Sequence, residues 1–258
     1  MVMRWVAVGA TLLLQLLLVT LSALWAAAAA AEPGSGPRET VDQTFTTVRP
    51  NTPTGGSFSA SFHAAGDPQG TPPFQTRMVV HPPRGMRYDT SVPDRCTAPD
   101  IQLEIMGPAA CPRGSRLGGG TIEGLVLAPF AHFVLDHYHH RVYVLNNTNE
   151  EIVLIESEGF TVVRGHLSPD GTMDFTQPTC FPVPPVGGCL DNYVIQLKNA
   201  IAMAPYTKTS GGRLRSYATT PPRCPTRHYW RTTVQFWWSD GSTDTVVTKQ
   251  ACRAGNSG

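Results

Sequence analysis

The stretch YWRTTVQFWWS, residues 229–239, decides the fold class because its side chains alternate in character along the chain. One set of alternate positions is mostly large and apolar: Trp230, Thr232, Val234, Phe236 and Trp238. The other set holds Arg231, Thr233, Gln235 and Trp237. A period of two is that of a β-strand with one buried face. Asp240-Gly241 is a turn signal, and residues 242–250 return as the partner strand, so the sequence predicts a β-hairpin.

The same alternation recurs upstream, whereas helical periodicity is almost absent. Turn signals separate the candidate strands, among them Asn-rich 146–149 and Pro-Asp-Gly at 169–171. The 24 glycines and 23 prolines are spread along the chain, as many short strands require. The sequence therefore predicts an all-β protein, an antiparallel two-layer β-sandwich. Its candidate strands are 57–63, 74–81, 141–145, 152–155, 160–167, 172–175, 193–197 and 213–217, followed by the last hairpin.

Residues 1–31 form an apolar leader that ends in a run of alanines, which offers cleavage sites for a signal peptidase. We expect a signal peptide here. The alternative is an uncleaved anchor, because the apolar run is long enough to cross a bilayer. Residues 32–40, which begin EPGSGP, are predicted to be a flexible stub, and residues 41–258 a single β-sandwich domain.

All six cysteines follow the leader, and an even number of cysteines behind an export signal is typical of disulfides formed in an oxidising compartment. We therefore predict a secreted protein, extracellular or in the cell envelope, stapled by disulfides. The last hairpin brings its flanking cysteines together and would be clasped at its base. The sequence-local pairs are Cys96 with Cys111, Cys180 with Cys189, and Cys224 with Cys252.

The charge content argues against a nucleic-acid partner. The net charge is +1 and 15% of residues are charged, compared with roughly 25% in average proteins. Such a chain has no strong overall field to attract a polyanion. Contact with a membrane is expected only if the leader is retained.

Two stretches resemble uncharacterised secreted proteins of high-GC Gram-positive (actinobacterial) bacteria. The first, residues 78–120, reads MVVHPPRGMRYDTSVPDRCTAPDIQLEIMGPAACPRGSRLGGG, and the second runs from Cys224-Pro225 through the last hairpin to Cys252. The resemblance implies a secreted β-sandwich with the disulfides Cys96–Cys111 and Cys224–Cys252, and it implies no activity. Cys180 and Cys189 are not part of the shared pattern.

The densest polar cluster is HFVLDHYHH, residues 132–140. On a strand, His137 and His139 share one face and could bind one metal ion, whereas Asp136 and His140 lie on the opposite face. No CxxC or HExxH motif supports a metal centre elsewhere in the chain. We interpret the segment as a polar hairpin end and predict no metal and no cofactor. The alternative is a secreted hydrolase or metal-dependent enzyme that uses His132–His140.

Aromatic surface is the other candidate feature. Trp237 lies on the polar face of the last hairpin with Arg231 and Gln235, and an exposed Trp there could stack on a sugar or anchor a peptide. Alternatively, Trp237 covers the sheet edge or packs under a loop. The chain contains no G-x-S-x-G nucleophile motif. The sequence therefore predicts a secreted, non-catalytic binding or structural module whose ligand is a glycan or a protein.

Overall fold

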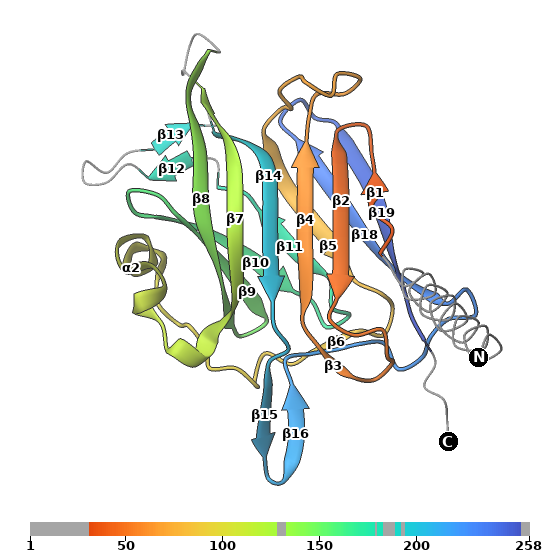
Figure 1. Ribbon diagram of the computed structural model, residues 1–258. Helices are drawn as coiled ribbons and strands as arrows, with labels where there is room; N and C mark the ends of the chain where they lie inside the picture. The colour runs from red at the N-terminus through yellow and green to blue at the C-terminus, as the bar shows by residue number, and fades with distance from the viewer. Residues whose placement is uncertain (1–30, 128–132, 179, 183–188, 192–193, 254–258) are drawn as a thin grey trace, which may run out of the picture. The chain divides into compact units, whose positions relative to one another are not determined.

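The computed structural model describes residues 31–127, 133–178, 180–182, 189–191 and 194–253 of the chain (Figure 1). At 180–182 and 189–191 it describes the backbone alone. Among these residues, none of the helices has the length and apolarity needed to span a membrane.

The main part of the described structure is one antiparallel sheet of twelve strands that is nearly closed into a barrel (Figure 1). The strand order in the sheet is β1-β2-β4-β14-β7-β8-β9-β10-β11-β5-β18-β19. The strands are β1 (Gly34–Ser35), β2 (Glu39–Phe45), β4 (Gly56–Phe62), β14 (Val194–Met203), β7 (Arg116–Leu127), β8 (Val134–Asn147), β9 (Glu150–Glu156), β10 (Phe160–Leu167), β11 (Met173–Thr176), β5 (Gln75–His81), β18 (Tyr229–Trp238) and β19 (Thr243–Ala251).

Short elements decorate this sheet. The described part of the chain has one α-helix, α2 (Asp100–Met106), followed by two 3₁₀ turns, η2 (Gly107–Ala110) and η3 (Arg113–Ser115). The small sheets are β3 (Pro53–Thr54), β17 (Ala218–Thr219) and β6 (Arg87–Tyr88); β15 (Thr207–Ser210) and β16 (Arg213–Ser216); and β12 (Cys180–Pro182) and β13 (Cys189–Asp191).

The all-β prediction is confirmed, but the two-layer sandwich is not. The structure has one continuous sheet that curls until its two ends approach each other, rather than two facing sheets. Alternation along a strand shows that one face is buried. It does not show whether a second sheet or the curvature of the same sheet covers that face.

The predicted hairpins and turns are confirmed. Strand β18 pairs with β19 from Tyr229 opposite Ala251 to Trp237 opposite Thr243, and the apolar face of β18 is buried as the alternation predicts. The Asn-rich turn joins β8 to β9. The Pro-Asp-Gly turn joins β10 to β11, and Gly171 there has a φ of 89°, which favours glycine.

Aromatic packing fills one part of the interior. Phe62 of β4 makes edge-to-face contacts with Phe236 and Trp238 of β18, with ring centroids 5.6 and 5.8 Å apart. Val41 and Val246 belong to the same buried cluster. This cluster ties β2 and β4 to β18 and β19 across the interior of the sheet.

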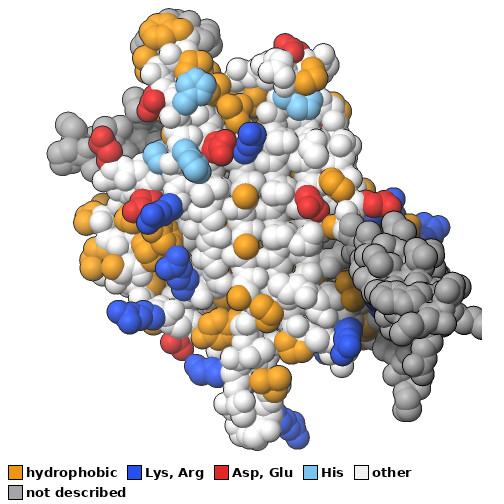
Figure 2. Space-filling view, viewed as in Figure 1, with side chains coloured by type: hydrophobic (Ala, Val, Ile, Leu, Met, Phe, Trp, Pro, Cys, Tyr) orange, Lys and Arg blue, Asp and Glu red, His pale blue; other side chains and the backbone are white. Residues whose placement is uncertain are grey.

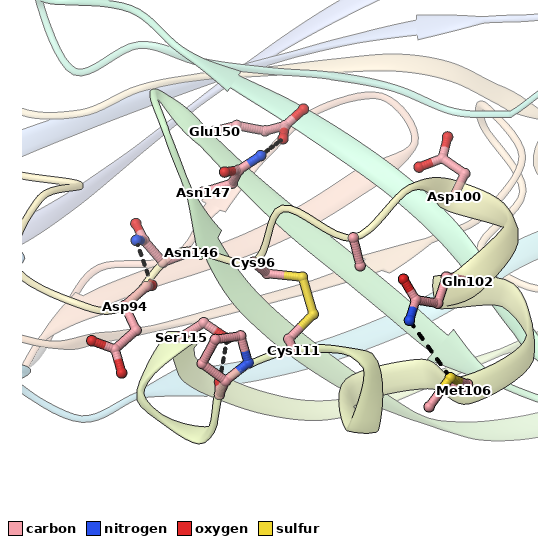
Figure 3. The surroundings of a disulfide bond; sticks show 12 residues. Asp94, Cys96, Asp100, Gln102, Met106, Cys111, Ser115, Asn146, Asn147 and Glu150 are labelled. Carbon is pink, nitrogen blue, oxygen red and sulfur yellow. Dashed lines mark hydrogen bonds between the residues drawn. A yellow bond between two sulfur atoms is a disulfide. The ribbon is translucent and has the colours of Figure 1, made fainter.

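A second, smaller core covers the outer face of β8 and β9 (Figure 3). Helix α2 contributes the fully buried Leu103, and the Cys96–Cys111 disulfide packs with it against Leu145 and Leu154. The backbone N–H of Cys96 donates to the Asn146 carbonyl at 2.8 Å. Around Val144 and Leu145, the side chains on both faces of β8 are therefore buried.

Two of the three predicted disulfides are confirmed. Cys96 and Cys111 are bonded with Cα atoms 4.9 Å apart, and Cys224 and Cys252 are bonded with Cα atoms 5.7 Å apart. These disulfides indicate an oxidising extracellular environment. The side chains of Cys180 and Cys189 lie outside the described residues, as do residues 1–30 of the predicted leader, so those two predictions stay open.

The sheet closes at a seam between β2 and β19, where the sequence suggested a flexible stub at 32–40. Instead, Glu32 forms two backbone hydrogen bonds with Lys249 of β19, at 2.7 and 3.1 Å, and β1 pairs with β2. Residues with turn character can still be ordered when a sheet edge offers unpaired backbone groups to bind.

Side chains complete this seam. The amide of Gln250 donates to the Phe45 carbonyl at 2.9 Å and accepts from its N–H at 2.5 Å, as a strand backbone would. Arg38 pairs with Asp244 at 2.8 Å and with Asp240 at 3.3 Å. Glu39 is fully buried beside them, and its carboxyl oxygens have no partner among the described residues.

Removing the disulfide at the base of the last hairpin should destabilise the fold. We expect the Cys224→Ala/Cys252→Ala variant to lose about 3–4 kcal/mol of unfolding free energy, because the bond closes a loop spanning 28 positions of the chain. A Tm lower by roughly 10 °C would follow for a domain of this size. Calorimetry measures it. An unchanged Tm would show that the hairpin is held by its packing alone.

The seam should weaken as pH rises. Burial, together with the Asp244 carboxylate, raises the pKa of Glu39 from its ordinary 4.5 to about 8. Between these values the folded chain keeps a proton that the unfolded chain has lost, so the free energy of unfolding should fall with rising pH. Urea unfolding from pH 5 to 9 measures this. Glu39→Gln should flatten the slope, and an equal slope in both proteins would contradict the assignment.

Candidate functional site

The interior of the sheet contains a cavity of about 130 Å³, which we call the inner chamber. Most of its lining is apolar, and its walls come from strands on all sides of the sheet. For comparison, an engineered protein cavity of roughly 150 Å³ accepts benzene. Representative lining residues are Phe58, Met78, Ile122, Val153, Phe175 and Ile201.

A second cavity of about 180 Å³, the outer chamber, adjoins the first. The two share five lining residues: Gln75, Ile122, Ile155, Gln177 and Gln196. Tyr138, His140 and Ser157 also line the outer chamber, and Ser157 is exposed to solvent. The outer chamber therefore connects the inner chamber to the surface.

Three glutamines, Gln75, Gln177 and Gln196, lie where the chambers meet, and we call them the glutamine neck. Gln75 opens β5 beside the register shift between β5 and β18, and Gln196 lies at a register shift in β14. Such bulges redirect side chains and often border binding sites. Gln177 directly follows β11, and its backbone N–H donates to the Thr76 carbonyl at 3.0 Å.

Gln75 is the neck residue that has an unpaired hydrogen-bond acceptor. Its side chain is buried, and its Oε1 has no hydrogen-bond partner among the described residues. A buried acceptor without a donor costs free energy, so native proteins rarely leave one unexplained. This atom is therefore a candidate contact for a bound molecule.

The inner chamber also contains a buried carboxyl group, that of Glu151 on β9. The Tyr217 hydroxyl donates to its Oε1 at 2.5 Å. Burial raises the pKa of Glu151, and the Tyr217 hydrogen bond partly opposes this rise. Burial and the nearby Glu151 carboxylate raise the pKa of the Tyr88 and Tyr217 hydroxyls, so both stay protonated.

The histidine segment does not converge on one site. Figure 2 shows histidine side chains on the surface over β8, and His137 and His139 lie exposed on its outer face. His140 faces the outer chamber, stacked on Tyr138 with ring centroids 5.0 Å apart, and burial lowers its pKa. His132 lies outside the described residues, which contain no cluster of three or more metal-ligating side chains.

The outer face of β18 carries the three residues of the predicted binding surface, and two of them already have partners. Trp237 is half-buried, and the Arg77 guanidinium lies 4.7 Å from its ring centroid. Gln235 is hydrogen-bonded to His81 at 3.1 Å, whereas Arg231 is exposed. The outer face of β18 can therefore offer a contact surface, but Trp237 and Gln235 are already held by Arg77 and His81.

Sequence reasoning missed the neck glutamines and Glu151. Gln75 stands inside a predicted strand, and a lone glutamine at a strand end gives no sign that it faces a cavity. Gln196 points inward only because β14 has a bulge, and alternation alone does not locate bulges.

Comparison with protein families, curated proteins and solved structures finds no match to this chain. The resemblance to secreted actinobacterial proteins stays a prediction. The function must therefore be argued from the chambers and the surface of this chain.

One prediction concerns the outer face of β18. If it contacts a cell-wall glycan, Trp237→Ala should weaken that association roughly thirtyfold. The free energy of unfolding should fall by only about 1 kcal/mol, because the main loss is the stacking of Arg77. Binding to isolated cell-wall glycan and urea unfolding measure the two effects. Large destabilisation with intact binding would place Trp237 in the core instead.

Proposed function

We propose that this chain is an extracellular, non-catalytic binding protein that holds a small, mostly apolar molecule inside its curled sheet. The observation that carries the proposal is the inner chamber itself. Protein interiors are packed as closely as organic crystals, and voids larger than a water molecule are few. An apolar chamber with a few convergent polar groups and a route to solvent is the usual form of a small-molecule site.

Location outside the cytoplasm or in the cell envelope is part of this proposal. It is supported by the two disulfides and by the predicted leader. The two disulfides also suit a protein with an internal cavity, because crosslinks offset the stability that is lost where side chains do not pack. The outer face of β18 remains the proposed contact with an envelope glycan.

The absence of catalysis is inferred from the arrangement of the reactive groups. The alternative enzyme would use residues 132–140, yet His137 and His139 lie on the outer face of β8 and His140 faces inward. Glu151 is bonded to a tyrosine rather than to a nucleophile or a general base. Neither arrangement resembles an activated nucleophile with its base.

Filling the inner chamber tests the proposal. Toluene should raise the Tm of the wild-type protein and shift the NMR signals of residues lining the chamber. Val153→Phe should weaken toluene binding at least about fivefold, because overpacking an apolar site costs roughly 1–3 kcal/mol. Val134→Phe, at an exposed site outside both chambers, is the matched control. Toluene binding that Val153→Phe does not affect would refute the chamber as the site.

A further inference from the structure

We infer that the ligand is a neutral amphiphile of the medium-chain alcohol type, with its hydroxyl at the glutamine neck and its apolar tail in the inner chamber. This inference rests on the proposed binding function. It adds the chemical class of the ligand and its orientation.

A hydrogen-bond donor is required by Gln75. Its Oε1 is buried and has no donor among the described residues, and Gln75 is one of the residues that line both chambers where they meet. A ligand hydroxyl there would donate to this oxygen and remove the cost of leaving it unpaired. The other two neck glutamines, Gln177 and Gln196, supply amide groups from which the same hydroxyl can accept. An ether or an alkane could not satisfy Gln75.

A neutral head group is favoured by the charges around it. No Lys or Arg stands among the described residues that line either chamber, so a carboxylate or phosphate would find no counter-charge. Glu151 is engaged by Tyr217, which leaves it poorly placed to receive an ammonium group. His140 is the basic side chain of the outer chamber, and burial lowers its pKa and favours its neutral form. Burying a charged head group here would therefore cost desolvation free energy that no opposite charge offsets.

The tail points inward because polarity changes along the route. The inner chamber beyond the neck is lined by side chains such as Met78, Val153 and Phe175. The outer chamber has the polar Tyr138, His140 and Ser157. An amphiphile that enters from the Ser157 side would bury its tail first and stop when its hydroxyl reaches the neck. The size of the inner chamber, about 130 Å³, limits the tail to a short or medium length.

Matched probes test the ligand class. We would titrate 1-heptanol, 1-methoxyhexane, heptanoate and heptylamine into the full chain at pH 7 and follow binding by calorimetry and NMR. 1-Methoxyhexane has the same number of heavy atoms as 1-heptanol but no donor. We expect 1-heptanol to bind about tenfold more tightly than the ether, because the ether leaves the buried oxygen of Gln75 without a donor. Heptanoate and heptylamine should bind more weakly than 1-heptanol.

Variants connect this discrimination to Gln75. Gln75→Leu should bring 1-heptanol down to the affinity of the ether, and Gln75→Met, which keeps an unbranched chain, does the same if the leucine variant fails to fold. Gln102→Leu, exposed on α2 and outside both chambers, is the matched control and should keep the tenfold preference.

The outcomes separate this inference from the proposed function. Equal affinity for alcohol and ether, both blocked by Val153→Phe, would overturn the alcohol class and leave the cavity function standing. Tighter binding of heptanoate or heptylamine would replace the neutral head with a charged one. If none of the four probes nor toluene binds the wild-type chain, the proposed function fails as well.

Discussion

The seam between β2 and β19 is the contact on which the rest of the structure depends. Before it closes, the sheet has two free edges and an apolar face open to water. The bridging strand β1 has only two residues, so side chains must take the place of missing backbone pairs. Gln250 does so by bonding both the N–H and the carbonyl of Phe45, and Arg38 links the start of β2 to Asp244 of β19. Closure turns the inner face into an interior and thereby creates a place for a cavity.

Packing within this interior is uneven, and the unevenness has structural causes. The aromatic cluster of Phe62, Phe236 and Trp238 fills the region beside the seam with large rings. Strands β7 to β10 contribute smaller aliphatic side chains to the interior, and the chambers lie against them. The outer cover of α2 and the Cys96–Cys111 disulfide lies over β8 and β9. This part of the wall is thus supported from outside, so it does not need a filled interior to hold its shape.

Local chemistry explains how much the sequence could predict. Alternation at 229–239 and the turn at 169–171 involve neighbouring residues, so strands, hairpins and the Cys224–Cys252 bond could be predicted from them. The curvature of the sheet could not be predicted, because it follows from contacts between residues that are far apart in the sequence. Glu32 and Lys249, for example, are 217 positions apart. The glutamine neck depends on both curvature and bulges, so no short pattern marks it. The placement of His137 and His140 on opposite faces needed only the two-residue period.

The buried polar atoms without partners differ in what could satisfy them. At the seam, Glu39 has the Asp244 carboxylate and Arg38 beside it, and taking up a proton removes its charge, so its burial has a local explanation. Asn146 leaves one oxygen unpaired while its amide nitrogen bonds two backbone carbonyls, at 2.9 and 3.0 Å, which fixes the loop over β8. Gln75 is a neutral amide and cannot escape its cost by changing its protonation. It also lines both chambers, so a molecule held there could supply the donor that the neighbouring side chains do not. The free energy cost of the unpaired Gln75 oxygen is therefore better explained by ligand binding than by folding. For this reason the glutamine neck is a stronger candidate site than the histidine segment.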